Sequence, residues 1–464
     1  MLFIFPLIYL TSFFVALREV IKGNRQGIFV FLIFGLSMYT TAMSVAFLLG
    51  LKDFIPVFQY FKEVLIISLL IINIVTLKYL PRLHLIDYAV LAFLLYTFIY
   101  AILPIGEESF FNRLLALKST SFFVVVYFTG RLMDIRTIYI SKYFNYIVLL
   151  TIAAGTVLLL EVIFNQHLQT ITGFADYVYY FFNFEPSGNF GLSWTFESEG
   201  GYPRFASFFA NPLEHASATL LALAVMIALF TRDNNKFKPT GIGWFGFAAS
   251  LLSITFALSR APFVSYFIII YVYALITKKK YITHTVHIVF GLAALYLIYL
   301  FTKFGDKNSG ITEVVMNTID FSNPSSVGHL LEWAEGILSM VEKPFGLGLG
   351  TSGRVAGSLG ENVGGENQYI IIGVQAGIIA LFLYLSVYIM LIRTSLKWLP
   401  KLRGKERQVC MAVLLLKIGF FIPLLTSEVE SSSYISYVNW FLSGLLISII
   451  MQFKTAQIQP ANDH

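Results

Sequence analysis

Long apolar stretches limit most strongly what this chain can fold into. Thirteen of them approach or reach the roughly 17 to 25 residues that an α-helix needs to cross a lipid bilayer. Backbone groups inside a bilayer must bond within the chain, and the ten-residue alternation of a membrane barrel is absent, so these stretches are predicted to be helices. They cover residues 2–17, 28–50, 57–77, 85–104, 114–130, 142–163, 213–230, 241–258, 262–277, 284–301, 367–392, 408–426 and 435–452.

Composition excludes a soluble globular fold. Of the 464 residues, 57% are hydrophobic and only 12% are charged, and the mean hydropathy is +0.75. Soluble domains carry about 25% charged residues. The chain is therefore predicted to be an all-α polytopic membrane protein, one integral membrane domain over residues 1–464 with about 13 transmembrane helices (12 to 14). Residues 1–17 lack a basic start and a cleavage site, which indicates a retained span rather than a signal peptide.

The net charge of +6 follows membrane topology. With the N-terminus outside, the inward segments hold 21 Lys or Arg residues against 6 acids, whereas the rest of the chain holds 11 basic and 20 acidic residues. Cytoplasmic loops are enriched in Lys and Arg, so the predicted orientation is N-terminus out and C-terminus in. The basic charge is thereby explained by membrane topology. Membrane lipids are expected as partners, and no nucleic-acid partner is expected.

Two outward connections, residues 164–212 and 302–366, are too long to be simple turns. The first is rich in aromatic residues and glycine. The second contains a helical apolar pattern over 325–342, which Asn323 and Pro324 would begin. Such a helix is expected to lie along the outer membrane interface, with Trp333 near the depth of the lipid headgroups.

Motifs of common soluble enzymes are absent, and the single cysteine, Cys410, excludes an internal disulfide and a cysteine metal site. No metal or other cofactor is expected. The glycine-rich run Pro344–Gly353 has no phosphate-binding lysine and lies in an outward loop. It is interpreted as a flexible hinge that returns the loop to the membrane, with a backbone nest for an anion as the alternative.

Outward arginines are the most informative charges. Arg204 precedes the seventh span, and Arg260 sits in a tight hairpin where Ser259 could cap the ninth span and Pro262 could occupy its first turn. A guanidinium beside a helix N-terminus suits phosphate oxygens. Each arginine could instead reach lipid headgroups or pair with a nearby acid.

Carboxylates form the second group of candidates. Glu366 and Asn367 stand at the start of the eleventh span, where Glu366 could be a general base or an acidic N-cap. His329 and Glu332 lie one turn apart on the expected interfacial helix, and they could equally form its solvated face. Ionisable groups inside spans usually have partners, but the sequence does not identify those of Lys417 and Glu161.

The order of these features resembles a known family. An outward SR hairpin is followed by a long loop with a Trp-containing helix and PFGLGLG, and then by EN-Y and GVQAGIIALFLY at a helix start. This order, mainly over residues 200–395, is similar to the O-antigen polymerase and O-antigen ligase superfamily of bacterial surface-polysaccharide assembly. The resemblance implies a glycosyltransferase of the membrane-embedded type C class in the bacterial cytoplasmic membrane. Its site would face the periplasm or exterior.

The resemblance also implies roles for particular residues. Arg204 and Arg260 match arginines that hold the diphosphate of an undecaprenyl-diphosphate-linked glycan donor. His329 stands where the family more often has arginine, for which Arg354 could substitute. Glu366 falls where ligases carry histidine, which favours a polymerase with Glu366 as the base. The remaining substrate-binding candidates are Glu332, Asn367 and Tyr369.

The implied reaction is an inverting transfer without a metal, in which arginines stabilise the departing lipid diphosphate. Donor and acceptor would both be lipid-linked glycans, and a chain-length regulator is a further candidate partner. Three alternatives stay open at the level of sequence. They are a ligase that transfers glycan to a lipid A core, a flippase or other transporter of lipid-linked oligosaccharide, and a multispan scaffold without catalysis.

Overall fold

The chain folds into helices throughout the part that the structure describes. The computed structural model describes residues 2–79, 81–198, 201–302, 324–360 and 362–458, and no β-strand occurs among them. All thirteen apolar stretches fall on helical segments, which confirms the all-α class. The helices of ten or more residues are α1 (Ile4–Ile21), α3 (Tyr39–Leu48), α4 (Ile55–Val75), α5 (Leu85–Ile102), α6 (Phe110–Arg131), α7 (Ile140–Phe164), α10 (Pro212–Phe230), α11 (Gly241–Phe256), α12 (Arg260–Ile276), α13 (Lys280–Thr302), α15 (Pro324–Glu342), α17 (Gln368–Trp398), α18 (Gly404–Phe420) and α20 (Ser433–Ile458). The shorter ones are α2 (Ile28–Val30), α8 (Leu168–Ile171), α9 (Phe174–Phe182), α16 (Gly353–Leu359), α19 (Pro423–Thr426), the π-helix η2 (Phe31–Gly35) and the 3-10 turns η1 (Arg25–Gly27), η3 (Lys52–Phe54), η4 (Ile135–Thr137), η5 (Trp194–Phe196) and η6 (Val429–Ser431).

Eight described helices are long and apolar enough to cross a membrane, or nine if the pair Arg25–Gly35 and Tyr39–Leu48, bent by 63°, counts as one span. The chain is therefore a multi-pass membrane protein. Two more predicted spans fall on the shorter apolar helices α11 and α12, of 16 and 17 residues. The full count of thirteen and the orientation stay predictions.

The bundle has buried central helices and lipid-facing outer ones. The apolar window of α20 is 94% buried and that of α10 is 83% buried, whereas those of α1 and α4 are 28% buried. Two glycines let α6 and α20 cross closely, because a Cβ on Gly444 would overlap the Tyr127 carbonyl oxygen and one on Gly130 would overlap that of Phe441. Small residues at such crossings are typical of helix packing in membranes.

The first long connection is fastened at both ends. Glu161, near the end of α7 and 4% exposed, accepts hydrogen bonds from the backbone N–H of Leu168 at 2.8 Å and of Ser207 at 2.7 Å. These bonds identify the partners of Glu161 that sequence reasoning did not find. Between the two anchors lie α8, α9 and η5.

The second long connection contains the expected amphipathic helix. The predicted range 325–342 corresponds to α15, while Asn323, the expected start, lies outside the described residues. The apolar side chains of its outer face are exposed, as membrane contact requires. Its other face packs on α17, where Gly336 meets Gly364 and Ile370. The exposed apolar residues are Leu330, Leu331, Ile337, Leu338 and Val341.

The glycine-rich run Pro344–Gly353 does return the loop to the bundle, but it is not the flexible hinge that the sequence suggested. Backbone N–H groups of Leu347 and Gly348 donate to carbonyl oxygens of α17, at 2.7 and 3.1 Å. The acceptors lie beside Gly377, where α17 breaks with φ of 80° and frees its backbone for these bonds. Hydrogen bonding to a broken helix therefore fixes the run in place.

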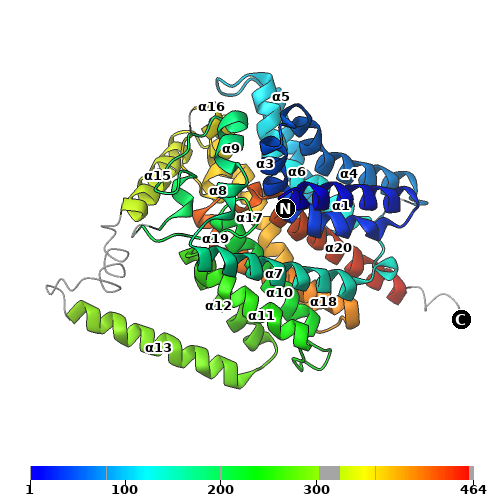
Figure 1. Ribbon diagram of the computed structural model, residues 1–464. Coiled ribbons are helices and arrows are strands. Elements are labelled where there is room, and N and C mark those ends of the chain that lie inside the picture. The colour runs from blue at the N-terminus through cyan, green and yellow to red at the C-terminus, as the bar shows by residue number, and fades with distance from the viewer. Residues whose placement is uncertain (1, 80, 199–200, 303–323, 361, 459–464) are drawn as a thin grey trace, which may run out of the picture.

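Figure 1 shows how the loops are arranged around the bundle. Helices α8, α9, α15 and α16, all from the two long connections, gather toward one side of the view, and the C-terminal end of α20 points to the opposite side. Helix α13 packs along α12 and projects from the other helices. The helices of the two long connections thus share one end of the protein.

Candidate functional site

Arg204 and Arg260 approach the same turn of the chain. The Arg204 Nε donates a hydrogen bond to the Ala257 carbonyl oxygen at 3.1 Å, and the neighbouring Phe205 N–H bonds the Phe256 carbonyl oxygen at 3.2 Å. This turn leads from the end of α11 into α12, whose first residue is Arg260. The half-buried Arg204 is therefore fixed on the turn that carries the exposed Arg260.

The start of α12 differs from its prediction in one respect. Ser259 occupies the N-cap position, but its side chain makes no capping hydrogen bond. The expectation that Ser259 caps this helix is wrong, because the side chain does not reach the first-turn N–H groups. Those groups add their partial positive charge to the end of the helix where Arg260 stands.

Glu332 of α15 lies directly against the turn that precedes α17. An ideal Cβ on Gly365 would lie 2.1 Å from Glu332 Oε2, far inside van der Waals contact. Gly365 also has φ of 69°, a left-handed conformation that glycine favours. On α15 itself, His329 Nδ1 lies 3.6 Å from Glu332 Oε2. Glycine is thus needed at 365 for two reasons, and it lets α15 approach Glu366.

Glu366 is reached by water, yet surrounding protein changes its acidity. Burial raises the pKa of the Glu366 carboxyl above its usual value. The charges of His329 and Arg204 act in the opposite direction, and that of Glu332 raises the pKa further. The pKa of Glu366 therefore responds to charges from both long connections, Arg204 of the first and two α15 residues of the second.

A carboxylate that the sequence did not single out completes this group. Glu428 follows α19, and its Oε2 accepts a hydrogen bond from the backbone N–H of Arg354 at 2.9 Å. Burial raises the pKa of Glu428 to about 7, and Glu366 adds to the increase while Arg354 opposes it. The Arg354 guanidinium lies 5.3 Å from the ring centre of Phe182, in cation–π geometry. We call six residues the outer cluster: Arg204, His329, Glu332, Arg354, Glu366 and Glu428.

Glu214 borders the outer cluster and was also missed. It lies in the first turn of α10, where Oε1 accepts from the Ser432 hydroxyl at 2.7 Å and Oε2 from the Ala210 N–H at 3.3 Å. The segment TSEVESSS between the last two spans held a usable signal for Glu428, because its two acids sit in a short connection between apolar helices. Glu214 had none, since an acid near a helix start is normally a capping residue.

Asn367 and Tyr369 have structural roles. Asn367 is the N-cap of α17, and its Oδ1 accepts from the Tyr369 and Ile370 N–H groups at 3.0 and 3.3 Å. The alternative interpretation of Glu366 as this N-cap is therefore wrong. The Tyr369 hydroxyl donates to the Phe421 carbonyl oxygen at 3.2 Å, and both candidates are buried.

The partners of Lys417 are two aromatic rings and the carboxylate of Glu430. Its ammonium lies 3.6 Å from the ring centre of Trp440 and 4.3 Å from that of Tyr388. The carboxylate of Glu430 accepts hydrogen bonds from Tyr384 and Tyr388 at 3.2 and 3.1 Å. Burial raises the pKa of Glu430, and the nearby positive charge of Lys417 opposes this increase. The pair is a buried charge interaction surrounded by aromatic rings.

Within the described residues, no group of three or more His, Cys, Asp or Glu side chains is arranged to hold a metal ion. The chemistry of the outer cluster is instead that of guanidinium groups beside partly shielded carboxyls. Such a combination can bind an anionic group and accept a proton.

Comparison of the chain with known protein families and with curated proteins finds no match.

Proposed function

We propose that the chain is an inverting glycosyltransferase that polymerises undecaprenyl-diphosphate-linked oligosaccharide repeat units on the outer face of the bacterial cytoplasmic membrane. The observation that carries this proposal is the fixing of Arg204 on the turn that leads into Arg260 at the start of α12, with Glu366 near enough for the charge of Arg204 to lower its pKa. An anion-binding group and a carboxyl of raised pKa are the two parts that such a transfer needs. The order of motifs shared with O-antigen polymerases supports the same assignment.

In the proposed reaction, an acceptor hydroxyl oxygen attacks the anomeric carbon of the donor glycan. The new glycosidic bond forms as the bond from that carbon to the lipid diphosphate breaks, and the electron pair leaves with the diphosphate. Arg204, Arg260 and the N-terminus of α12 would stabilise the negative charge that develops there. Glu366 would accept the hydroxyl proton, and attack opposite the leaving group would invert the anomeric centre.

Glu428 supplies a second carboxyl at the same place. Its pKa of about 7 suits proton exchange near neutral pH. We assign it to the acceptor side as a group that orients the hydroxyl, because its hydrogen bond to the Arg354 backbone fixes its position. His329, Glu332 and Arg354 would contact the sugar or the diphosphate.

The membrane arrangement belongs to the same proposal. It comprises thirteen spans, an external N-terminus, an internal C-terminus and the type C class of glycosyltransferase. The partners would be lipid-linked donor and acceptor glycans, with a chain-length regulator as the protein partner.

Reconstitution of the full chain tests the function. Purified protein in liposomes is supplied with an undecaprenyl-diphosphate repeat unit, and products are resolved by length. We expect a ladder of polymers from the wild type and from Glu335→Gln, a matched control on the exposed face of α15. Glu366→Gln should yield only the single repeat unit.

Three outcomes would contradict the proposal. Transfer of a preformed glycan to a lipid A core without elongation would identify a ligase. Movement of the labelled repeat across the membrane without elongation would identify a transporter. A normal ladder from Glu366→Gln would remove the proposed base.

A further inference from the structure

A large pocket lies at the other end of the bundle, away from the outer cluster. It has a volume of about 810 Å³, within the range of about 300 to 1,000 Å³ typical of small-molecule sites. Its wall combines arginines with apolar side chains. The residues used below are Arg82, Arg131, Asp134, Arg136, Glu406 and Gln452.

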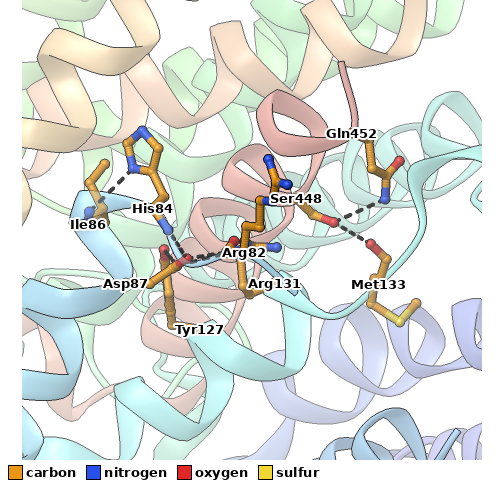
Figure 2. Close-up of polar contacts among 9 residues, drawn as sticks. All are labelled: Arg82, His84, Ile86, Asp87, Tyr127, Arg131, Met133, Ser448 and Gln452. Carbon is orange, nitrogen blue, oxygen red and sulfur yellow. Dashed lines mark hydrogen bonds and ion pairs between the residues drawn. The ribbon is translucent and has the colours of Figure 1, made fainter. Parts of the chain in front are cut away.

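Arg131 is the fixed element of this pocket. Its side chain is only 4% exposed, and its Nε lies 3.2 and 3.1 Å from the two carboxylate oxygens of Asp87. Nη2 donates to the Arg82 carbonyl oxygen at 2.9 Å. Asp87 is held in turn by the Tyr127 hydroxyl at 2.6 Å, as Figure 2 shows. This network positions the guanidinium and uses only part of its donors.

The remaining nitrogen of Arg131, Nη1, has no hydrogen-bond partner among the described residues. A guanidinium offers five N–H donors, two of them on Nη1. Because Arg131 lines the pocket, a bound group with acceptor oxygens can use these donors. A buried cation held in position for an acceptor loses little side-chain entropy when it binds one.

Each of the two acidic residues in the pocket wall lies near a basic residue. Arg136 lies 2.8 Å from Asp134 through Nη2, and Lys405 is close enough to Glu406 to influence its charge. Arg82 is exposed at the pocket and has no matched acid among the described residues. Burial lowers the pKa of the nearby His84 imidazole, Lys454, Arg131 and Lys397 lower it further, and Asp87 opposes them. The pocket wall itself holds three arginines, at 82, 131 and 136, against two acids, Asp134 and Glu406.

The pocket also sits at the ends of membrane helices. Leu77 follows α4, Arg82 precedes α5, and the lining residues from Ser448 to Thr455 belong to the last turns of α20. These three helices are candidate membrane spans, so their ends lie at headgroup depth. Apolar side chains such as Ile449 and Phe453 line the same wall.

We propose that this pocket binds a phosphate group, with Arg131 Nη1 and the Arg82 guanidinium as its donors. Arginine suits phosphate because its planar fork can bond two oxygens at once. A phospholipid headgroup and a small soluble phosphate ester offer the same chemistry. The apolar part of the wall favours a ligand that also carries acyl chains. The site is separate from the outer cluster and does not depend on the proposed transfer reaction.

Binding measurements on the purified full chain test the site with two probes. Dioleoylphosphatidylglycerol in detergent micelles supplies the lipid source, and glycerophosphoglycerol supplies the same phosphodiester without acyl chains. Calorimetric titration gives an affinity for each probe. Arg82→Gln should weaken binding by about tenfold or more, because it removes a charged donor. Arg232→Gln is the matched control, an exposed arginine on another predicted inward loop.

A second variant protects the test against a local folding defect. Arg136→Gln leaves Asp134 without its partner, so it should weaken binding through repulsion while the Arg131–Asp87 pair stays intact. Size-exclusion chromatography verifies that each variant is folded. Saturable binding of the lipid alone assigns the source as a headgroup, and equal binding of both probes assigns a soluble phosphate. The proposal is overturned if the wild type binds neither probe, or if the pocket variants bind like Arg232→Gln.

Discussion

The backbone N–H of Arg354 donates a hydrogen bond to the Glu428 carboxylate at 2.9 Å. This bond joins the short helix α16 of the second loop to the connection before the last membrane helix, two segments that are 74 residues apart. It fixes a carboxyl group whose pKa is raised by burial beside Glu366. The pKa of Glu428 and the position of the second loop therefore depend on the same hydrogen bond.

The first prediction concerns pH and stability. The pKa of Glu428 is about 7 in the folded protein and 4.5 in the reference state. Between these values the folded state binds more protons than the unfolded state, so stability falls as pH rises through this window. We expect the unfolding temperature of the wild type to decrease from about pH 5 to about pH 8. Glu428→Gln should show a shallower slope in thermal unfolding, and an unchanged slope would contradict the assignment.

The second prediction concerns the leaving group. Arg260→Ala should abolish polymer formation, because removal of one positioned donor raises the barrier by about 3 to 4 kcal/mol. Arg260→Lys keeps the charge but loses the planar fork, so it should rescue only weakly. Glycan ladders from cells that carry each variant report the effect. Near-normal ladders from Arg260→Ala would refute this role.

The third prediction concerns the turn before α17. Gly365→Ala places a methyl group against Glu332 and strains a residue with φ of 69°. The backbone strain alone should destabilise the protein by about 1 to 2 kcal/mol. Displacement of Glu332 should additionally lower polymer formation. Gly360→Ala is the matched control, because Gly360 has φ of 103° but no neighbour within 4 Å. Equal loss of activity in both variants would mean that strain alone matters.

The fourth prediction concerns the buried charge pair. Lys417→Met should destabilise the protein by about 3 to 5 kcal/mol, because Glu430 would keep a buried charge without its partner. The double variant Lys417→Met/Glu430→Gln should recover part of that loss, since neither charge remains. Chemical unfolding in detergent measures all four proteins of the cycle. Strictly additive losses would show that the two residues do not interact.

Apolar stretches were sufficient to predict the positions and order of the long helices, but not the short helices α8, α9 and α16 or the 63° bend within the predicted span 28–50. The amphipathic pattern over 325–342 located α15 almost to the residue, because that face repeats regularly. The break in α17 was not predictable, since GVQAGII contains no proline and an isolated glycine is tolerated within helices. The reason for the break at Gly377 is visible only in the structure, where the run Pro344–Gly353 forms hydrogen bonds with the freed backbone of α17.

The sequence predicted several residues of the candidate site but not how they are brought together. Arg204 and Glu366 stand out locally, as charges in outward loops beside apolar spans. The influence of Arg204 on the pKa of Glu366, and the hydrogen bond between Glu428 and Arg354, depend on the approach of distant segments that carry no local pattern. Lys417 was recognised as an unusual charge, but its ring partners lie on α17 and α20.

The Glu161 carboxylate accepts N–H groups from both ends of the first outer loop, at Leu168 and Ser207. Arg204 lies three residues before the second anchor, and its backbone N–H donates to the Phe196 carbonyl oxygen at 2.8 Å. The loop between the anchors therefore holds the arginine in place together with Ser207. A graft that changes the length of this loop would shift the arginine, so the choice of glycan is better altered by substitutions that keep the length.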